Sequence, residues 1–74
     1  MIDKKEIMII ATELKEVALK LELDNISTQL KDYDLILNVY KNSCEILIKD
    51  LNNKKLEVYH LEDDILMLDH VEKL

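Results

Sequence analysis

The chain of 74 residues contains no glycine and no proline. Glycine supplies the positive φ angles that tight turns use, and proline interrupts helices. A chain that lacks both residues is expected to consist of long segments without sharp turns. This absence favours helices over β-hairpins. The same absence excludes a phosphate-binding glycine loop, because that loop depends on glycine at fixed positions.

Basic residues are also scarce. The sequence has no arginine, and 10 basic residues face 16 acidic ones, which gives a net charge of −6. Proteins that bind nucleic acid need clustered lysine and arginine to contact phosphate, so we expect no direct nucleic-acid binding and no DNA-reading helix. A basic protein partner, or one whose nucleic-acid groove this chain can occupy, is favoured instead.

Cysteine and long apolar runs are nearly absent. The single cysteine, Cys44, has no partner for an internal disulfide. This usage is typical of a reducing compartment, so we expect a cytoplasmic protein. No segment approaches the roughly 20 consecutive apolar residues of a membrane span, so we expect no membrane association.

The first predicted element is a helix over residues 3–23. Asp3 and Glu6 have the spacing of a capping box at a helix start. Apolar residues then recur at steps of three and four, the spacing of a heptad stripe: they are Ile7, Ile10, Leu14, Val17 and Leu21.

Two more stripes with the same spacing follow, separated by Asp24-Asn25 and by Asn52-Asn53. They predict helices over 25–51 and 54–73, joined by short turns in which asparagine takes the left-handed conformation. The sequence therefore predicts one small all-α domain over 1–74, an antiparallel three-helix bundle or helical hairpin with heptad-like seams.

An α+β fold is the alternative. Residues 35–40, 44–49 and 56–61 are short, rich in β-branched or aromatic residues and loosely alternating, as strands are. Acidic residues after position 61 suit the first turn of a helix starting near residue 62. This pattern predicts helix, three-stranded antiparallel meander, helix, and residues 34–61 remain open between helix and sheet.

Chemistry-bearing residues do not predict an enzyme. Glu57 and His60 have the Glu-x-x-His spacing of di-iron bundles, but no second copy exists, so a solvated helix face is favoured and no metal or cofactor is expected. Cys44 falls in phase with apolar neighbours, which favours a buried hydrophobe over a nucleophile.

The predicted function is a non-enzymatic protein-interaction module, an acidic helical regulator that self-associates or binds a partner helix, because the stripes exceed what three short helices need internally. Its predicted contact residues are Ile26, Leu30, Tyr33, Leu37, Tyr40, Leu61, Ile65 and Leu68. The alternative is an acidic inhibitor that blocks a basic, nucleic-acid-binding site on a target protein. Its predicted acidic face comprises Glu57, Glu62, Asp63, Asp64, Asp69 and Glu72.

Overall fold

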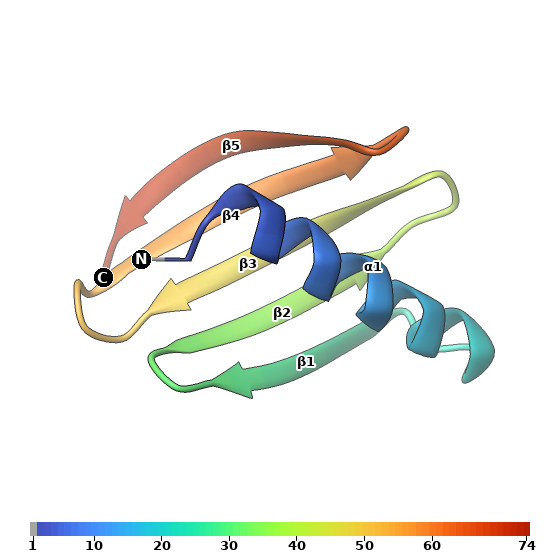
Figure 1. The fold of residues 1–74 in the computed structure, drawn as a ribbon, viewed down its shortest axis with the longest axis horizontal. Helices are drawn as coiled ribbons and strands as arrows, with labels where there is room; N and C mark the ends of the chain where they lie inside the picture. Colours follow the sequence, from blue (N-terminus) through green and yellow to red (C-terminus); the bar gives the residue numbers. More distant parts are fainter. Residues whose placement is uncertain (1) are drawn as a thin grey trace.

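The computed structural model describes residues 2–74 and is mostly β. Helix α1 (Lys4–Lys20) precedes five strands: β1 (Asn25–Leu30), β2 (Tyr33–Val39), β3 (Ser43–Asp50), β4 (Lys55–Glu62) and β5 (Ile65–Lys73). The strands pair antiparallel in sequential order. Helix α1 crosses one face of this sheet diagonally (Figure 1).

The predicted first helix is confirmed, with ends close to those expected. The side chain of Asp3 caps the helix, because its Oδ1 accepts a hydrogen bond from the Glu6 N–H at 2.9 Å. The predicted stripe meets the sheet in its first half, because Ile7 is buried and Ile10 and Leu14 pack against the core, whereas Leu21 is exposed. Ile7, Ala11 and Ala18 are the buried residues of α1, whereas Val17 is exposed.

The helix ends in a Schellman motif made without glycine. The Leu23 N–H donates to the Ala18 carbonyl at 2.8 Å, and the Glu22 N–H donates to the Leu19 carbonyl at 3.3 Å. Glu22 takes the left-handed conformation with φ of 57°. A residue with a Cβ carries a steric cost of about 1 kcal/mol there, which glycine does not.

Replacing that glutamate by glycine is expected to stabilise the protein. Glu22→Gly removes the Cβ clash and should raise the free energy of unfolding by about 1 kcal/mol. The matched control, Glu16→Gly, lies in the exposed helix interior and should lower it by about 1 kcal/mol. Urea denaturation measures both, and a loss of stability in both variants would contradict the assigned helix end.

The predicted three-helix bundle is wrong. The predicted helices over 25–51 and 54–73 are five strands, so no heptad seam or coiled coil exists in residues 25–73. The α+β alternative placed its three meander strands on β2, β3 and β4, where the structure has them. Its second helix is wrong, because the residues after the Asp63-Asp64 turn form the fifth strand.

The turns explain why missing glycine did not exclude hairpins. Asp63 and Asp64 both have positive φ, 51° and 60°, as the two central residues of a type I′ hairpin turn do. Lys54, with φ of 50°, takes the left-handed position after β3 that the sequence assigned to Asn52-Asn53. In the break after the helix, neither Asp24 nor Asn25 has a positive φ. Glu22 takes the left-handed conformation there instead.

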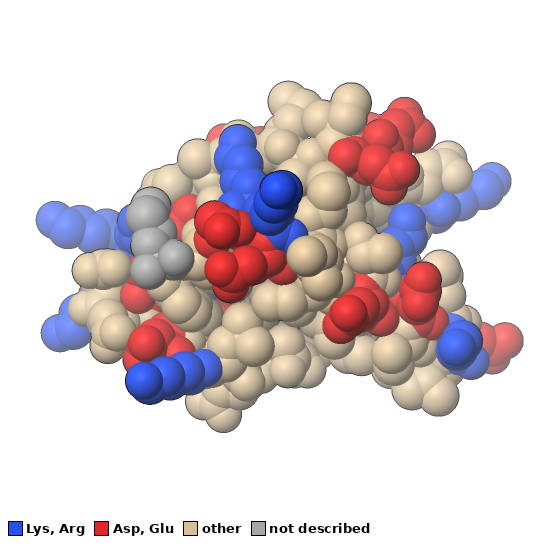
Figure 2. Space-filling view, in the orientation of Figure 1, with Lys and Arg blue, Asp and Glu red and all other residues tan. Residues whose placement is uncertain are grey.

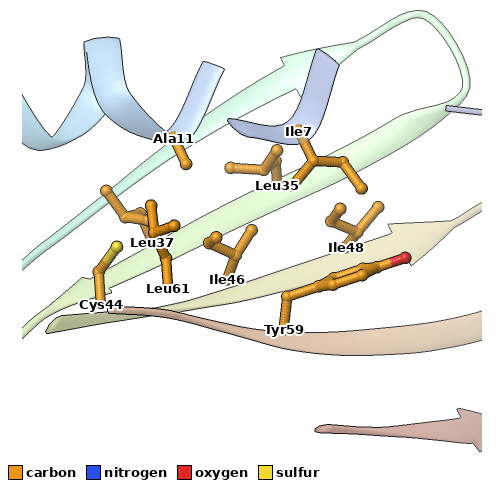
Figure 3. Packing of buried hydrophobic residues seen from close by; sticks show 9 residues of the cluster. All are labelled: Ile7, Ala11, Leu35, Leu37, Cys44, Ile46, Ile48, Tyr59 and Leu61. Atoms are coloured by element: carbon orange, nitrogen blue, oxygen red, sulfur yellow. The ribbon is translucent and has the colours of Figure 1, made fainter. Parts of the chain in front are cut away.

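The core lies between α1 and one face of the sheet. Burial alternates along β3, where Cys44, Ile46 and Ile48 point toward the helix and are fully buried. The core comprises Ile7, Ala11, Leu35, Leu37, Cys44, Ile46, Ile48, Tyr59 and Leu61 (Figure 3). Because no element covers the other face in residues 2–74, half of the sheet's side chains are left facing outward.

Candidate protein-binding face

The uncovered side of the sheet carries a row of apolar residues across its three central strands. Antiparallel register places Ile36 of β2 beside Leu47 of β3, and Leu47 beside Val58 of β4. Cross-strand neighbours of this kind have side chains in contact on the same face. We call this side of the sheet the open face, and the row Ile36–Leu47–Val58 its centre.

Exposure varies along the row. Ile36 is 42% exposed, Leu47 is half-buried, and Val58 is only 4% exposed. Val58 lies outside the core cluster beneath α1, so its burial comes from neighbours on the open face itself. Half-buried Leu56 and exposed Met67 extend the apolar area toward β5. The open face thus has a continuous apolar centre without a covering element.

Charged residues border this centre, and acidic ones outnumber lysine, although His60 and His70 lie 3.5 and 3.8 Å from Glu62 and Glu72 on the same face. Outward-pointing carboxylates on four strands are Asp34, Glu45, Glu62 and Glu72, and Lys49 is the one lysine among the outward-pointing strand residues. The Asn38 amide donates to Glu45 Oε1 at 3.1 Å, which holds that carboxylate against the sheet. An apolar centre with an acidic border favours a complementary partner surface, which is also apolar in the middle but basic at the edge.

The helix side of the molecule is different. On the face seen in Figure 2, which α1 crosses, acidic and basic side chains are interspersed. A cleft of about 430 Å³ on this side has Lys15 and Lys41 opposite the acidic turn at Asp63 and Asp64. Charges of both signs meet there, so the cleft does not select a ligand of one charge.

The predicted contact residues do not form one surface. Leu37 and Leu61 lie in the core, and Ile26, Leu30 and Tyr33 are half-buried on the helix side of β1 and β2. Three others are exposed: Tyr40 in the turn after β2, and Ile65 and Leu68 on β5. The structure therefore leaves these three free for a partner and uses the rest for internal packing.

The predicted acidic residues are also divided, because a strand alternates between faces. Glu62 borders the open face, Asp63 and Asp64 form the β4–β5 turn, and Asp69 and Glu72 lie on β5. Glu57 points to the helix side and does not belong with them.

Glu57 instead supports the core. The Tyr59 hydroxyl donates to its Oε2 at 2.7 Å, and the Lys55 Nζ lies 3.9 Å from its Oε1. Burial of the ring, together with the bond to Glu57, raises the pKa of Tyr59 to about 12. Tyr59 therefore stays a neutral hydrogen-bond donor at every physiological pH.

The residues that the sequence analysis considered as metal ligands or as a nucleophile are separated or buried in the structure. Glu57 and His60 are three apart on a strand and point to opposite faces, so the Glu-x-x-His spacing no longer joins them. In residues 2–74 no group of three or more His, Cys, Asp or Glu side chains is placed to hold a metal ion. Burial raises the pKa of the Cys44 thiol, which keeps it protonated and poorly nucleophilic.

Asp50 shapes the β3–β4 turn, a role that the sequence analysis missed. Its Oδ1 accepts hydrogen bonds from the Asn52 and Asn53 N–H groups at 3.1 Å, and its Oδ2 accepts one from the Asn53 amide at 2.8 Å. The residue is 3% exposed. These bonds, led by that from the Asn53 side chain, lower the pKa of Asp50.

This shift predicts a pH-dependent stability. Because the folded pKa lies below the unfolded value of about 3.9, the charged carboxylate stabilises the fold above about pH 4, and this contribution is lost as the pH falls through the folded pKa. Asp50→Asn should lower the Tm at pH 7, and its difference from wild type should shrink below pH 4. The exposed Asp24→Asn is the control. A difference that does not change with pH would contradict the assigned role of the charge.

Comparisons with known proteins add no relative. The sequence matches no protein-family model, and neither the curated proteins nor the solved structures compared with it gave a match. Within residues 2–74, no helix is both long enough and apolar enough to cross a membrane. The open face is therefore the candidate site for a function.

Proposed function

We propose that this chain is a non-enzymatic binding protein whose open face covers a basic site on a target protein. The observation that carries the proposal is the apolar area of the open face, where Ile36 and Met67 are exposed and Leu47 is half-buried, with more acidic than basic residues around it. An exposed apolar patch on a small protein is typical of an interface, and the acidic border selects a basic target.

Nucleic-acid-binding sites are the kind of target that this charge pattern favours. Such sites are concave or flat surfaces rich in lysine and arginine, and they are often lined with apolar or aromatic residues that contact bases. A sheet face bordered by carboxylates, on a chain with a net charge of −6, can occupy such a surface in place of phosphate. The chain would then act as an inhibitor, and the predicted partner helix is not required.

A reducing compartment suits this function. Cys44 is a free thiol buried in the core, where oxidation to an adduct would disrupt packing. A cytoplasmic location is part of this proposal, and the targets would be intracellular nucleic-acid-binding proteins.

The test uses the immobilised chain as bait for proteins from a cell extract. Wild type should retain basic proteins that excess duplex DNA or RNA releases, because nucleic acid and the open face compete for one site. Ile36→Lys should lose them, because it places a charge in the apolar centre. Ile9→Lys, an equal change at a residue 58% exposed on α1, should retain them.

A second pair of variants separates charge from apolar contact. Asp34→Asn with Glu45→Gln should weaken binding and reduce its dependence on salt, whereas Glu13→Gln with Glu16→Gln on the helix should change neither. Retention of the same proteins by Ile36→Lys, or no release by nucleic acid, would contradict the proposed function.

A further inference from the structure

The two edges of the sheet differ sharply. Edge strand β1 has six residues and no exposed large apolar side chain, and polar Asn25, Ser27 and Gln29 point to its open side. Edge strand β5 has nine residues and exposes apolar side chains on both faces. The exposed ones are Ile65 (61%), Met67 (61%), Leu68 (46%) and Val71 (51%).

The features of β5 that could prevent pairing with another strand lie in its C-terminal half. Natural edge strands are commonly protected by lysine, proline, bulges or inward charges. Here the irregularity in pairing with β4 falls between Val58 and Tyr59, opposite Asp69, and the one lysine of the strand is Lys73. The segment 65–68 before them is regular, apolar and unpaired on its outer edge. This half of β5 is thus suited to accept another strand.

We propose that β5 pairs antiparallel with β5 of a second copy, which joins two sheets into one. The backbone direction fits this pairing. The two-residue turn makes Glu62 and Ile65 a hydrogen-bonded pair, so Leu66 and Leu68 direct their N–H and C=O groups away from β4. A two-fold axis at Met67 places Leu66 of one copy opposite Leu68 of the other, with all four backbone groups paired.

The side chains are self-complementary in this register. Leu66 and Leu68 both point to the helix side, where they are paired with core residues Leu61 and Tyr59. Two copies bring four leucines together there, and this patch continues both cores. The same axis places Asp64 of one copy near His70 of the other. Two acidic open faces placed against each other would instead repel, so the edge is the favoured site for a second copy.

This proposal does not rest on the proposed function, because both open faces stay uncovered in the dimer. Sedimentation equilibrium over about 10 μM to 1 mM, a range suited to a short interface, tests it. The mean mass of wild type should rise with concentration from the 8.7 kDa of one chain toward twice that value. Leu68→Lys should stay monomeric, and Ile9→Lys should associate as wild type does.

Hydrogen exchange on the wild-type protein gives a second readout that needs no variant. The Leu66 and Leu68 amides should exchange quickly when dilute and several-fold more slowly when concentrated, while the edge amides of β1 should not change. A mass that stays at 8.7 kDa throughout would overturn the proposal and leave the edge to a strand of another protein. The proposal would also be overturned if the Leu68→Lys variant still associated. It would be overturned as well if slower amide exchange at high concentration were confined to β1.

Discussion

Ile46→Ala is expected to lower the free energy of unfolding by about 3 kcal/mol, the loss typical of a large-to-small change in a fully buried position. Ile46 lies on the central strand β3, is 0% exposed, and is flanked by Leu37 on β2 and Tyr59 on β4. A domain of this size has a total stability of about 4–11 kcal/mol, so the variant would lose a large part of it.

Its matched control is Ile36→Ala, on the opposite face of the neighbouring strand. Ile36 is 42% exposed and lies outside the core, so the same truncation should cost less than about 1 kcal/mol. Urea denaturation of both variants measures the difference. Equal losses would mean that both faces of the sheet are covered, which would contradict the existence of an open face.

Ala11→Asp is expected to unfold the protein at neutral pH. Ala11 is 0% exposed where α1 meets the sheet, within the cluster that includes Leu35 and Leu37. A carboxylate buried there has no partner, and its desolvation costs several kcal/mol, comparable with the whole stability of the domain. The far-ultraviolet circular dichroism spectrum should lose its ordered signal.

Thr12→Asp is the matched control, one residue further along the same helix. Thr12 is exposed, and its hydroxyl donates only to the Met8 carbonyl of its own helix, at 2.8 Å. The carboxylate at that position remains in water, so the loss should be below about 1 kcal/mol. A folded Ala11→Asp variant would contradict the packing of α1 against the sheet.

The first helix was predictable because its signals are local. The Asp3 cap and the apolar spacing act within one or two turns, and no distant contact is needed to form them. The buried face was predicted for Ile7, Ile10 and Leu14, but not for the last turns of the helix. Small Ala11 and Ala18 let the helix approach the sheet closely, while the larger Val17 stays exposed.

The sheet was obscured by the residues that form the candidate binding face. A strand with one buried face alternates apolar and polar residues. Ile36 between Leu35 and Leu37, and Leu47 between Ile46 and Ile48, turn that alternation into continuous apolar runs. Such runs also contain residues at steps of three and four, which is why they were interpreted as heptad stripes.

The fifth strand and the turns were hidden for separate reasons. Apart from half-buried Leu66, the segment 65–73 is exposed, so its sequence lacks the apolar alternation of a half-buried strand. The left-handed positions are held by Glu22 and Lys54, whose residue types rarely take them, and by Asp63 and Asp64, which suit a turn but were interpreted as the acidic first turn of a helix. The open face itself depends on strand register, which no local pattern reveals.

Methyl NOE spectroscopy of the wild-type protein can show whether α1 covers one face of the sheet and leaves the other open. Contacts should join Ile7 and Ala11 to Leu35 and Ile46, and none should join α1 to Ile36, Leu47 or Val58. NOEs from α1 to those three residues, or helical NOEs through residues 33–62, would contradict the account.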